Sequence, residues 1–504
     1  MGRRRTAVWN LVFGYAQLGV TITRNVLLVP LYLRFVDVAE YGAWLATAGV
    51  LAQLFVSDFG LTATVIQRAA SAFGRGDKAV LGRAVGSSLS VSLLLGSLLT
   101  AISLAVSPFI PAMAGGDPHA RQTLLYCFII VAAGNGIGIV GLAASGVLRA
   151  LQRPIVSGAI TMASDVMNIL ASVAMLYAGH GLYALAAGHA ARNALLALAG
   201  VAVCLWVCRR RLELVPDWSV RDARSMFAAS YYQFFTSVAQ RVQSKADVFF
   251  VGLLLGPHAA ALYGLTARAG ETVQMLSAQV VASIDASLAH LHGGGDKRRF
   301  GEVLRIALAS TACVGALGMM GVAAFNESFV ALWVGPELFA GQPTSLLLAA
   351  TGVVVTLGSV FYVALTARGE FRSLSNAYVT SVVVNVPLLF LLVPLGVWGA
   401  ALAALVAALC RTGLLGHALH RNLGSEPGER WQGTSLVAAT TLPAVAVATL
   451  ALVLTHPASG WWEFAGAVVA FLLVTGMVTW LTNRRLFGQL ARELNMSLGA
   501  LRAR

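Results

Sequence analysis

The sequence has little charge for its length. Only 11% of its 504 residues are Asp, Glu, Lys or Arg, whereas soluble domains carry roughly 25%. Hydrophobic residues make up 58% of the chain, and the mean hydropathy is +0.77. So few polar groups cannot cover a folded surface against water. The composition therefore excludes an ordinary soluble protein, and we expect lipid to be the solvent.

Cysteine is also scarce, and its spacing is uninformative. The five cysteines all fall inside apolar runs, and no two have the C-x-x-C spacing of a metal site. They are Cys127, Cys204, Cys208, Cys313 and Cys410. This pattern excludes a disulfide framework, so we expect the cysteines to pack between helices. We predict no metal, no cofactor and no catalytic residue, and hence no enzyme.

The sequence lacks a cleavable leader and long polar loops. The basic start Met1–Arg5 precedes the first apolar run, but no small-residue cleavage site follows that run. We therefore expect the first helix to remain as a membrane anchor. The longest outer loop is predicted at Asn326–Thr344, and it is too short to fold as a domain.

Long apolar runs occupy most of the chain. A helix needs about 20 apolar residues to cross a bilayer. The runs predict spans at 8–34, 40–66, 83–111, 122–148, 155–178, 183–207, 226–254, 259–289, 303–325, 343–366, 376–396, 398–419, 434–455 and 462–483. The predicted fold is therefore an all-α polytopic membrane protein with about fourteen transmembrane helices.

The position of the basic residues accounts for the net charge of +14. With the N-terminus placed in the cytoplasm, Lys and Arg collect in the inner loops at nearly every turn. The outer loops hold little beyond Arg34 and Arg121. This is the positive-inside pattern, which predicts cytoplasmic N- and C-termini and contact with membrane lipids. A nucleic-acid partner is not needed to explain the charge.

The chain also repeats itself. A Tyr-Gly segment at 40–49 is followed by Gly-Asp-Lys at 76–78, and a second Tyr-Gly segment at 262–270 is followed by Gly-Asp-Lys at 295–297. The two copies are six predicted spans apart, which preserves orientation across the membrane. Chance similarity between apolar helices is the alternative. The repeat predicts three parts: six-helix lobes at 1–210 and 211–425, and two extra helices with a basic tail at 426–504.

Several cations lie inside predicted spans, where charge is costly unless it faces a cavity or a partner. The repeat places Arg24 and Lys245 at nearly matching depths, and Arg241 shares a helix face with Lys245. Arg268 lies near the outer half of the following span. Because guanidinium groups bind phosphate as a fork, we predict that these four cations line a cleft between the lobes and bind an anionic substrate.

Internal ion pairs are the alternative role for these charges. Arg268 can pair with Glu271, and Asp165 can pair with Arg192, so that the pairs hold helices together.

Three carboxylates are candidates for coupling transport to protons or sodium. They are Asp58, Asp165 and Asp247. Burial raises the pKa of a carboxylate and a nearby cation lowers it, so such a site can be tuned to titrate. Helix capping or ion pairing is an equally good explanation of each.

One glycine-rich run imitates a nucleotide-binding fingerprint. Residues 136–141 read Gly-Ile-Gly-Ile-Val-Gly, but they lie inside an uncharged run at 122–148. Gly134 and Gly138 also form a G-x-x-x-G, which permits close approach of helices in a membrane. Helix packing is therefore the preferred interpretation.

Several segments resemble the polysaccharide flippases, the Wzx-type O-antigen and exopolysaccharide exporters of the MATE-like MOP superfamily. The segments are Asn25–Arg34, Glu40–Trp44, Ser57–Leu61, Lys245–Gly252 and Leu332–Pro336. Each motif alone is loose, but together they follow the family order over most of the chain.

The resemblance implies a V-shaped, two-lobed fold of twelve to fourteen helices in a bacterial inner membrane. It implies passage of an undecaprenyl-pyrophosphate-linked oligosaccharide to the periplasmic leaflet, with polysaccharide-assembly proteins as possible partners. Arg24 and Arg268 match positions thought to meet the pyrophosphate in related flippases. Asp285 departs from the family, where many relatives have proline, so the end of its helix is in doubt.

The sequence supports three functions in order of preference. A flippase of lipid-linked oligosaccharide working by alternating access comes first. An ion-coupled multidrug exporter of the same superfamily comes second, because cationic drugs favour acidic clefts and cations are in surplus here. A membrane glycan polymerase or ligase comes third, because the outer loops are short and nearly uncharged.

Overall fold

The structure is a computed structural model, and it describes most of the chain. The described residues are 17, 19–49, 51, 69–114, 117–214, 217, 220–293, 297–423, 442, 445–452 and 458–482. Within these ranges the secondary structure is helical and contains no strand. The predicted all-α fold is thus confirmed.

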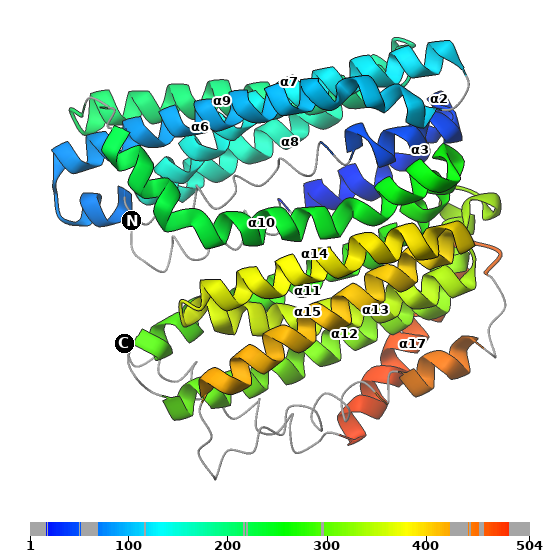
Figure 1. Cartoon of the computed structure of the whole chain (residues 1–504). Coiled ribbons are helices and arrows are strands. Elements are labelled where there is room, and N and C mark those ends of the chain that lie inside the picture. The colour runs from blue at the N-terminus through cyan, green and yellow to red at the C-terminus, as the bar shows by residue number, and fades with distance from the viewer. Residues whose placement is uncertain are drawn as a thin grey trace. The chain divides into compact units, whose positions relative to one another are not determined.

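The chain divides into two compact units, residues 1–264 and 265–504. The first unit contains η1 (Thr23–Leu27), α2 (Val29–Phe35), α3 (Val38–Ala46), α6 (Lys78–Val106), η2 (Ser107–Ala114), α7 (Pro118–Ala150), α8 (Pro154–Tyr177), α9 (Tyr183–Trp206), η3 (Val207–Arg211) and α10 (Val220–Leu255). In this unit α7 packs against α6 and α9, and α8 packs against α9 (Figure 1).

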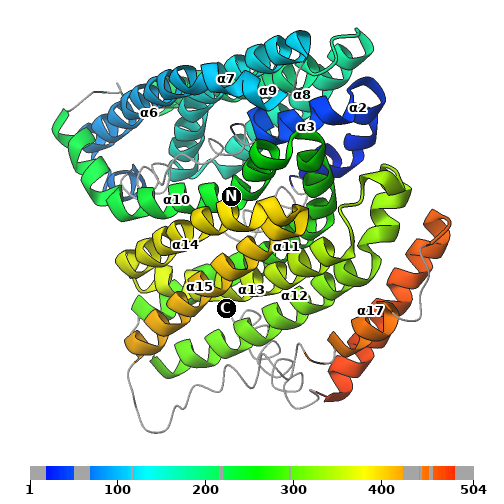
Figure 2. The ribbon, with the colours of Figure 1, turned by 45° about the vertical axis from the view of Figure 1, so that its right-hand side comes forward.

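Helix α11 (Pro257–Gly293) begins in the first unit and continues into the second. The second unit also contains α12 (Lys297–Trp333), η4 (Pro336–Leu338), α13 (Gln342–Ala367), α14 (Phe371–Leu392), η5 (Val393–Leu395), α15 (Val397–Leu423) and α17 (Trp461–Thr482). Helix α15 packs against α13 and α14, and α17 packs along α12 (Figure 2). An edge-to-face contact of Phe325 and Phe471, with ring centroids 5.6 Å apart, joins α12 to α17.

The observed helices correspond to most of the predicted spans, although some extend beyond them, as α12 does beyond 303–325. Nine helices in the described ranges are long and apolar enough to cross a membrane. The span predicted at 155–178, for example, corresponds to α8, and the span predicted at 343–366 corresponds to α13. The predicted spans 40–66 and 434–455 lie largely outside the described residues.

The outer loop predicted at Asn326–Thr344 is too long, because α12 continues to Trp333. Asn326 is buried in that helix, and its side-chain amide donates to the Thr266 carbonyl and to the Ser345 hydroxyl. A polar side chain whose amide donates to neighbouring helices can lie inside a transmembrane helix without ending it. The real turn begins near Gly335, whose φ of 116° suits glycine.

Aspartates mark the starts of three helices in the first unit. The Asp37 side chain accepts from the Ala39 N–H at the start of α3, and the Asp77 side chain accepts from the Val80 N–H at the start of α6. Asp117 caps α7 in the same way. Each cap satisfies a backbone donor that has no partner within the helix. The Asp of the first Gly-Asp-Lys turn is therefore a helix cap.

The glycine run of α7 is a packing surface, as predicted. A Cβ placed on Gly134 would lie 3.1 Å from the Ala190 Cα, and one on Gly141 would lie 2.7 Å from the Ala197 N, both on α9. Gly136 faces the other way, towards the Gly96 carbonyl of α6. Small residues thus let three helices pack at close range, which leaves no loop to cradle a nucleotide.

The two Tyr-Gly segments of the repeat meet within the first unit. A Cβ on Gly42 of α3 would lie 1.8 Å from the Pro257 carbonyl oxygen at the start of α11. A Cβ on Gly264 of α11 would lie 2.7 Å from the Leu45 Cδ1 of α3. The glycine after each tyrosine therefore permits a close approach of the two repeated helices.

The repeat also continues into later helices of each unit. Gln152 and Gly369, in the turns before α8 and α14, both have positive φ, 58° and 74°. The buried pair Ser164 and Asn168 of α8 has the same spacing as the buried pair Ser381 and Asn385 of α14. Helix α10 packs against α3 and α6 and so belongs to the first compact unit. The lobe boundaries at 210 and 425 stay a prediction.

Candidate substrate site

The segment that carries Arg24 is not a regular α-helix. Thr23–Leu27 forms a π-helix, and α2 begins directly after it with Pro30 in its first turn. Proline lacks an N–H, so it costs no hydrogen bond only in the first turn of a helix, where the N–H groups have no partner within the helix. Short π-helical stretches occur frequently at functional sites. The backbone that carries Arg24 therefore departs from regular α-helical geometry.

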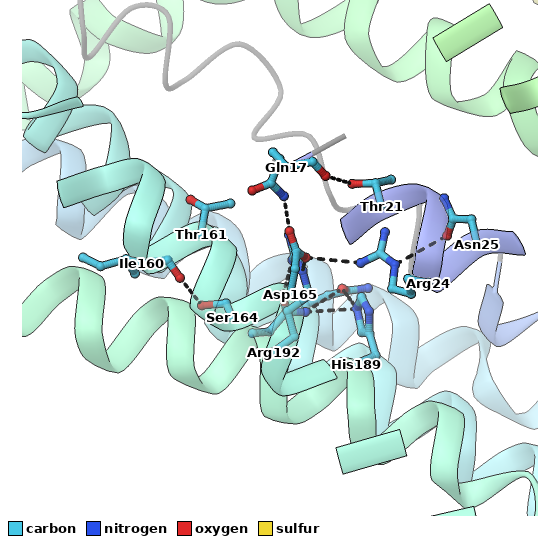
Figure 3. A network of polar contacts seen from close by, with 12 residues as sticks. Gln17, Thr21, Arg24, Asn25, Ile160, Thr161, Ser164, Asp165, His189 and Arg192 are labelled. Atoms are coloured by element: carbon cyan, nitrogen blue, oxygen red, sulfur yellow. Dashed lines mark hydrogen bonds and ion pairs between the residues drawn. The ribbon is translucent and has the colours of Figure 1, made fainter. Parts of the chain in front are cut away.

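Asp165 of α8 lies at the centre of a charged cluster (Figure 3). Its Oδ1 accepts from Arg192 Nε of α9 at 2.5 Å and from Arg24 Nη1 at 3.3 Å. Its Oδ2 accepts from the Gln17 side-chain amide. The Asp165 side chain is only 4% exposed. The cluster thus joins the first helical segment of the chain to two later helices.

A polar network continues from this cluster into the first unit. Arg192 Nη1 donates to the Asn193 Oδ1 at 3.0 Å, and Asn193 Nδ2 lies 3.0 Å from His189 Nε2. His189 Nε2 also lies 2.7 Å from Asn135 Oδ1 of α7. Asn135 Nδ2 donates to the Leu51 carbonyl. Connected polar side chains in a low-dielectric interior strengthen one another and hold a single arrangement.

Two cations of the cluster share one carboxylate. The guanidinium groups of Arg24 and Arg192 both contact Asp165. Buried charges are tolerated only when they are paired and hydrogen-bonded. The Arg192 side chain is 11% exposed, whereas that of Arg24 is 28% exposed. Arg24 is therefore the cation that a ligand reaches more easily.

The other predicted cations lie elsewhere in the chain. Arg241 and Lys245 are half-buried and one turn apart on α10. Asp247 of the same helix accepts a hydrogen bond from the Tyr263 hydroxyl at 3.2 Å. This contact links α10 to the Tyr-Gly segment of α11.

Arg268 forms the ion pair that its sequence neighbour suggests. Its Nη1 lies 3.0 Å from Glu271 Oε2, three residues along α11, and its side chain is 10% exposed. Arg268 belongs to the second unit and Arg24 to the first. Of the predicted substrate-binding cations, Arg24 is brought into contact with a predicted ion-coupling carboxylate, Asp165. Asp58 lies outside the described residues, as does the side chain of Asp285.

Sequence reasoning missed the neutral members of the network. Gln17, Asn135, His189 and Asn193 were not singled out, although all four are polar residues in apolar runs. A signal was available for two of them, because His189 and Asn193 are four residues apart and share a helix face. Asn135 lies between Gly134 and Gly136 in α7, in a run whose glycine pattern indicates helix packing. Among the described residues, no three His, Cys, Asp or Glu side chains lie together as a metal site would require.

The sequence matches one protein family and a curated relative. Residues 32–338 match a family described as "Polysaccharide biosynthesis protein". One curated relative is the probable low-salt glycan biosynthesis flippase Agl15 of Haloferax volcanii, which is 22% identical over 224 residues. That match covers 44% of this chain and 48% of the relative. The chain thus matches about half the length of the curated relative.

Solved structures of transporters share the fold. The lipid II flippase MurJ, in an inward closed conformation, has a TM-score of 0.69 at 15% identity, over 95% of this chain and 100% of that one. An inward-facing multidrug resistance MATE family transporter of the MOP superfamily has a TM-score of 0.62 at 14% identity, over 83% and 94%. A MOP superfamily transporter from Pyrococcus furiosus has a TM-score of 0.57 at 16% identity, over 84% and 96%. The chain therefore shares its fold with these membrane transporters.

Proposed function

This chain belongs to the family of polysaccharide biosynthesis proteins, and from that premise we propose that it moves a lipid-linked oligosaccharide across the membrane. The substrate would be an undecaprenyl-pyrophosphate-linked oligosaccharide for surface polysaccharide. The family match carries the proposal. The name of the curated relative and the fold shared with a lipid II flippase support it.

The polar cluster around Asp165 supports an anionic substrate. The cluster holds two guanidinium groups against the Asp165 carboxylate, and Arg24 is the more exposed of the two cations. Guanidinium groups bind phosphate oxygens through paired N–H donors. We infer that Arg24, Arg241, Lys245 and Arg268 bind the pyrophosphate or the glycan during transport. The lipid tail would remain in the bilayer while the glycan crosses by alternating access.

The cellular setting follows from the same proposal. The protein would lie in a bacterial inner membrane with both termini in the cytoplasm, because positive charge concentrates on that side. The lobes at 1–210 and 211–425 would alternate access, and the segment at 426–504 would be an appendage. Polysaccharide-assembly proteins would be its partners. Asp58, Asp165 and Asp247 stay candidates for ion coupling.

Alanine substitution of single cations tests the proposal. Arg24→Ala, Lys245→Ala and Arg268→Ala are expressed separately in a strain that lacks the native gene. We expect each to lose most surface glycan while the protein still accumulates in the membrane, because each removes a charge that meets the pyrophosphate. Arg34→Ala is the matched control, since Arg34 is exposed on α2. Normal glycan in all three variants would contradict the proposed role of these cations.

A multidrug exporter is the second candidate, because the fold is also that of a multidrug resistance MATE family transporter. An exporter would raise resistance to cationic drugs in a host that lacks its own pumps. We expect no such resistance, since the guanidinium groups of Arg24 and Arg192 beside Asp165 would repel a cationic drug. A glycan polymerase or ligase is not favoured by any observation in the structure.

A further inference from the structure

We propose that Asp165 is an internal substitute for the anionic head of the substrate, which holds Arg24 while the site is empty and releases it to a diphosphate ester. The inference rests on the proposed function, in which Arg24 meets the pyrophosphate. It gives Asp165 a positioning role and makes Arg192 the anchor that keeps Asp165 in place.

The two guanidinium groups hold Asp165 unequally. Both contact the same carboxylate oxygen, but Arg192 lies at 2.5 Å and Arg24 at 3.3 Å. Arg192 is also the less exposed of the two, and its other nitrogen is fixed by Asn193. A charge-assisted hydrogen bond weakens as it lengthens beyond about 2.9 Å. The Arg24 contact is therefore the one that an incoming anion can replace at least cost.

The Asp165 carboxylate remains held when Arg24 leaves. Arg192 supplies a neutralising charge, and the Gln17 amide donates to the second oxygen. A buried carboxylate that lost its only cation would be strongly destabilised. Because a second cation is already in contact, the exchange of Arg24 does not leave an unpaired buried charge.

The backbone around Arg24 suits a side chain that moves. Arg24 lies in the π-helix Thr23–Leu27, and Pro30 follows in the first turn of α2. The Leu28 N–H bonds to the Thr23 carbonyl five residues before it, in place of the four-residue step of an α-helix, and such stretches are frequent at functional sites. Arg24 Nε lies 3.4 Å from the Asn25 Oδ1, a contact at the outer limit of hydrogen-bond distance.

The proposed ligand is a diphosphate group, which a lipid and free pyrophosphate both carry. Phosphate and carboxylate oxygens accept from the same guanidinium donors, but a diphosphate carries more charge and offers oxygens to two N–H groups of Arg24, of which the Asp165 contact uses Nη1. The source of the diphosphate is either a polyprenyl lipid in the bilayer or free pyrophosphate in water. Full-length protein in lipid nanodiscs separates these sources when undecaprenyl diphosphate in the lipid and inorganic pyrophosphate in solution are used as separate probes.

A double-mutant cycle tests the exchange. Asp165→Asn, Arg24→Gln and the double variant are compared with the wild type for the dissociation constant of each probe. We expect Asp165→Asn to bind about tenfold more tightly, because a competing anion is removed, and Arg24→Gln to bind about tenfold more weakly. Asp165→Asn should give no gain in the Arg24→Gln background, since the cation that it frees is absent. Asp165→Glu keeps the competing charge, so it should not show the tighter binding of Asp165→Asn.

Weaker binding by Asp165→Asn, or an equal effect in both backgrounds, would overturn the proposal in favour of a structural role. If Asp165→Asn does not accumulate, difference infrared spectroscopy of the wild type replaces the cycle. Pyrophosphate should then shift a carboxylate band that moves again in Asp165→Glu. An unshifted band on ligand binding would overturn the exchange. A response to inorganic pyrophosphate but not to the lipid would contradict the lipid as the source.

The proposed function can fail separately from this inference. Glycan export is measured in cells, whereas the cycle measures binding alone. Normal export by Arg24→Ala with an intact binding cycle would contradict the role of Arg24 in flipping and leave the exchange at Asp165. Lost export with no coupling in the cycle would contradict the exchange alone.

Discussion

At the scale of single residues, the role of each cation beside Asp165 depends on how deeply its side chain is buried. Asp165 is almost fully buried, and it contacts one deeply buried cation and one half-buried cation. The net contribution of a buried ion pair is small, but breaking one is costly because a charge is left uncompensated. Arg192 should therefore matter to stability and Arg24 to ligand binding.

Replacing Arg192 should destabilise the protein. We expect Arg192→Leu to lower the free energy of unfolding by about 3 kcal/mol, the lower end of the usual cost, because Arg24 still neutralises Asp165 in part. Thermal unfolding of the purified protein in detergent measures the loss. The double variant Arg192→Leu, Asp165→Leu should regain most of it, since the buried carboxylate is gone. A stable Arg192→Leu would show that Asp165 does not need this partner.

At the scale of helices, close contacts explain the glycine of each Tyr-Gly segment. Gly42 of α3 faces backbone atoms of Pro257, whereas Gly264 of α11 faces the end of the flexible Leu45 side chain. Backbone cannot move aside as a rotamer can, so the same added methyl group has different costs at the two positions. The repeat is thus symmetrical in sequence but unequal in packing.

Alanine at the two glycines should separate these costs. We expect Gly42→Ala to lower the free energy of unfolding by about 3 kcal/mol through overpacking. The thermal unfolding temperature and the accumulation in the membrane should both fall. Gly264→Ala should cost about 1 kcal/mol or less, because Leu45 can change its rotamer. Gly413→Ala is the control, since nothing lies near that position on α15. Equal effects at Gly42 and Gly264 would contradict the close approach of α3 to α11.

At the scale of the whole molecule, the number and direction of the spans define the topology. The positive-inside pattern predicts cytoplasmic termini. The turn between α12 and α13 then lies outside, and so does the turn before α17. The span predicted at 434–455 decides whether the chain reaches that second turn from the cytoplasm.

Reporter fusions test this topology. Alkaline phosphatase fused after Pro336 or after Ser459 should be active, because the enzyme folds only outside the cytoplasm, and green fluorescent protein fused after Arg504 should fluoresce. The fusion after Ser459 tests the span at 434–455, since loss of that one crossing would place Ser459 inside. Active phosphatase after Arg372, at the start of α14, would contradict the predicted direction of the second half.

The sequence by itself determined the class of fold and the approximate positions of most helices. Hydropathy is a local property, and a run of about 20 apolar residues has no stable alternative to a helix in lipid. Span 155–178 therefore matches α8 within a residue or two. Local pattern also suggested the pair Arg268–Glu271, because its partners are three residues apart on one helix.

Only the tertiary structure decided which distant side chains meet. Arg24 and Asp165 are 141 residues apart in the chain, and their contact depends on the rotation and packing of helices that the apolar pattern leaves open. The same holds for Asn326, which looks like a loop residue until neighbouring helices supply its partners. Hydropathy depends on composition along one helix, whereas a site depends on the relative placement of several.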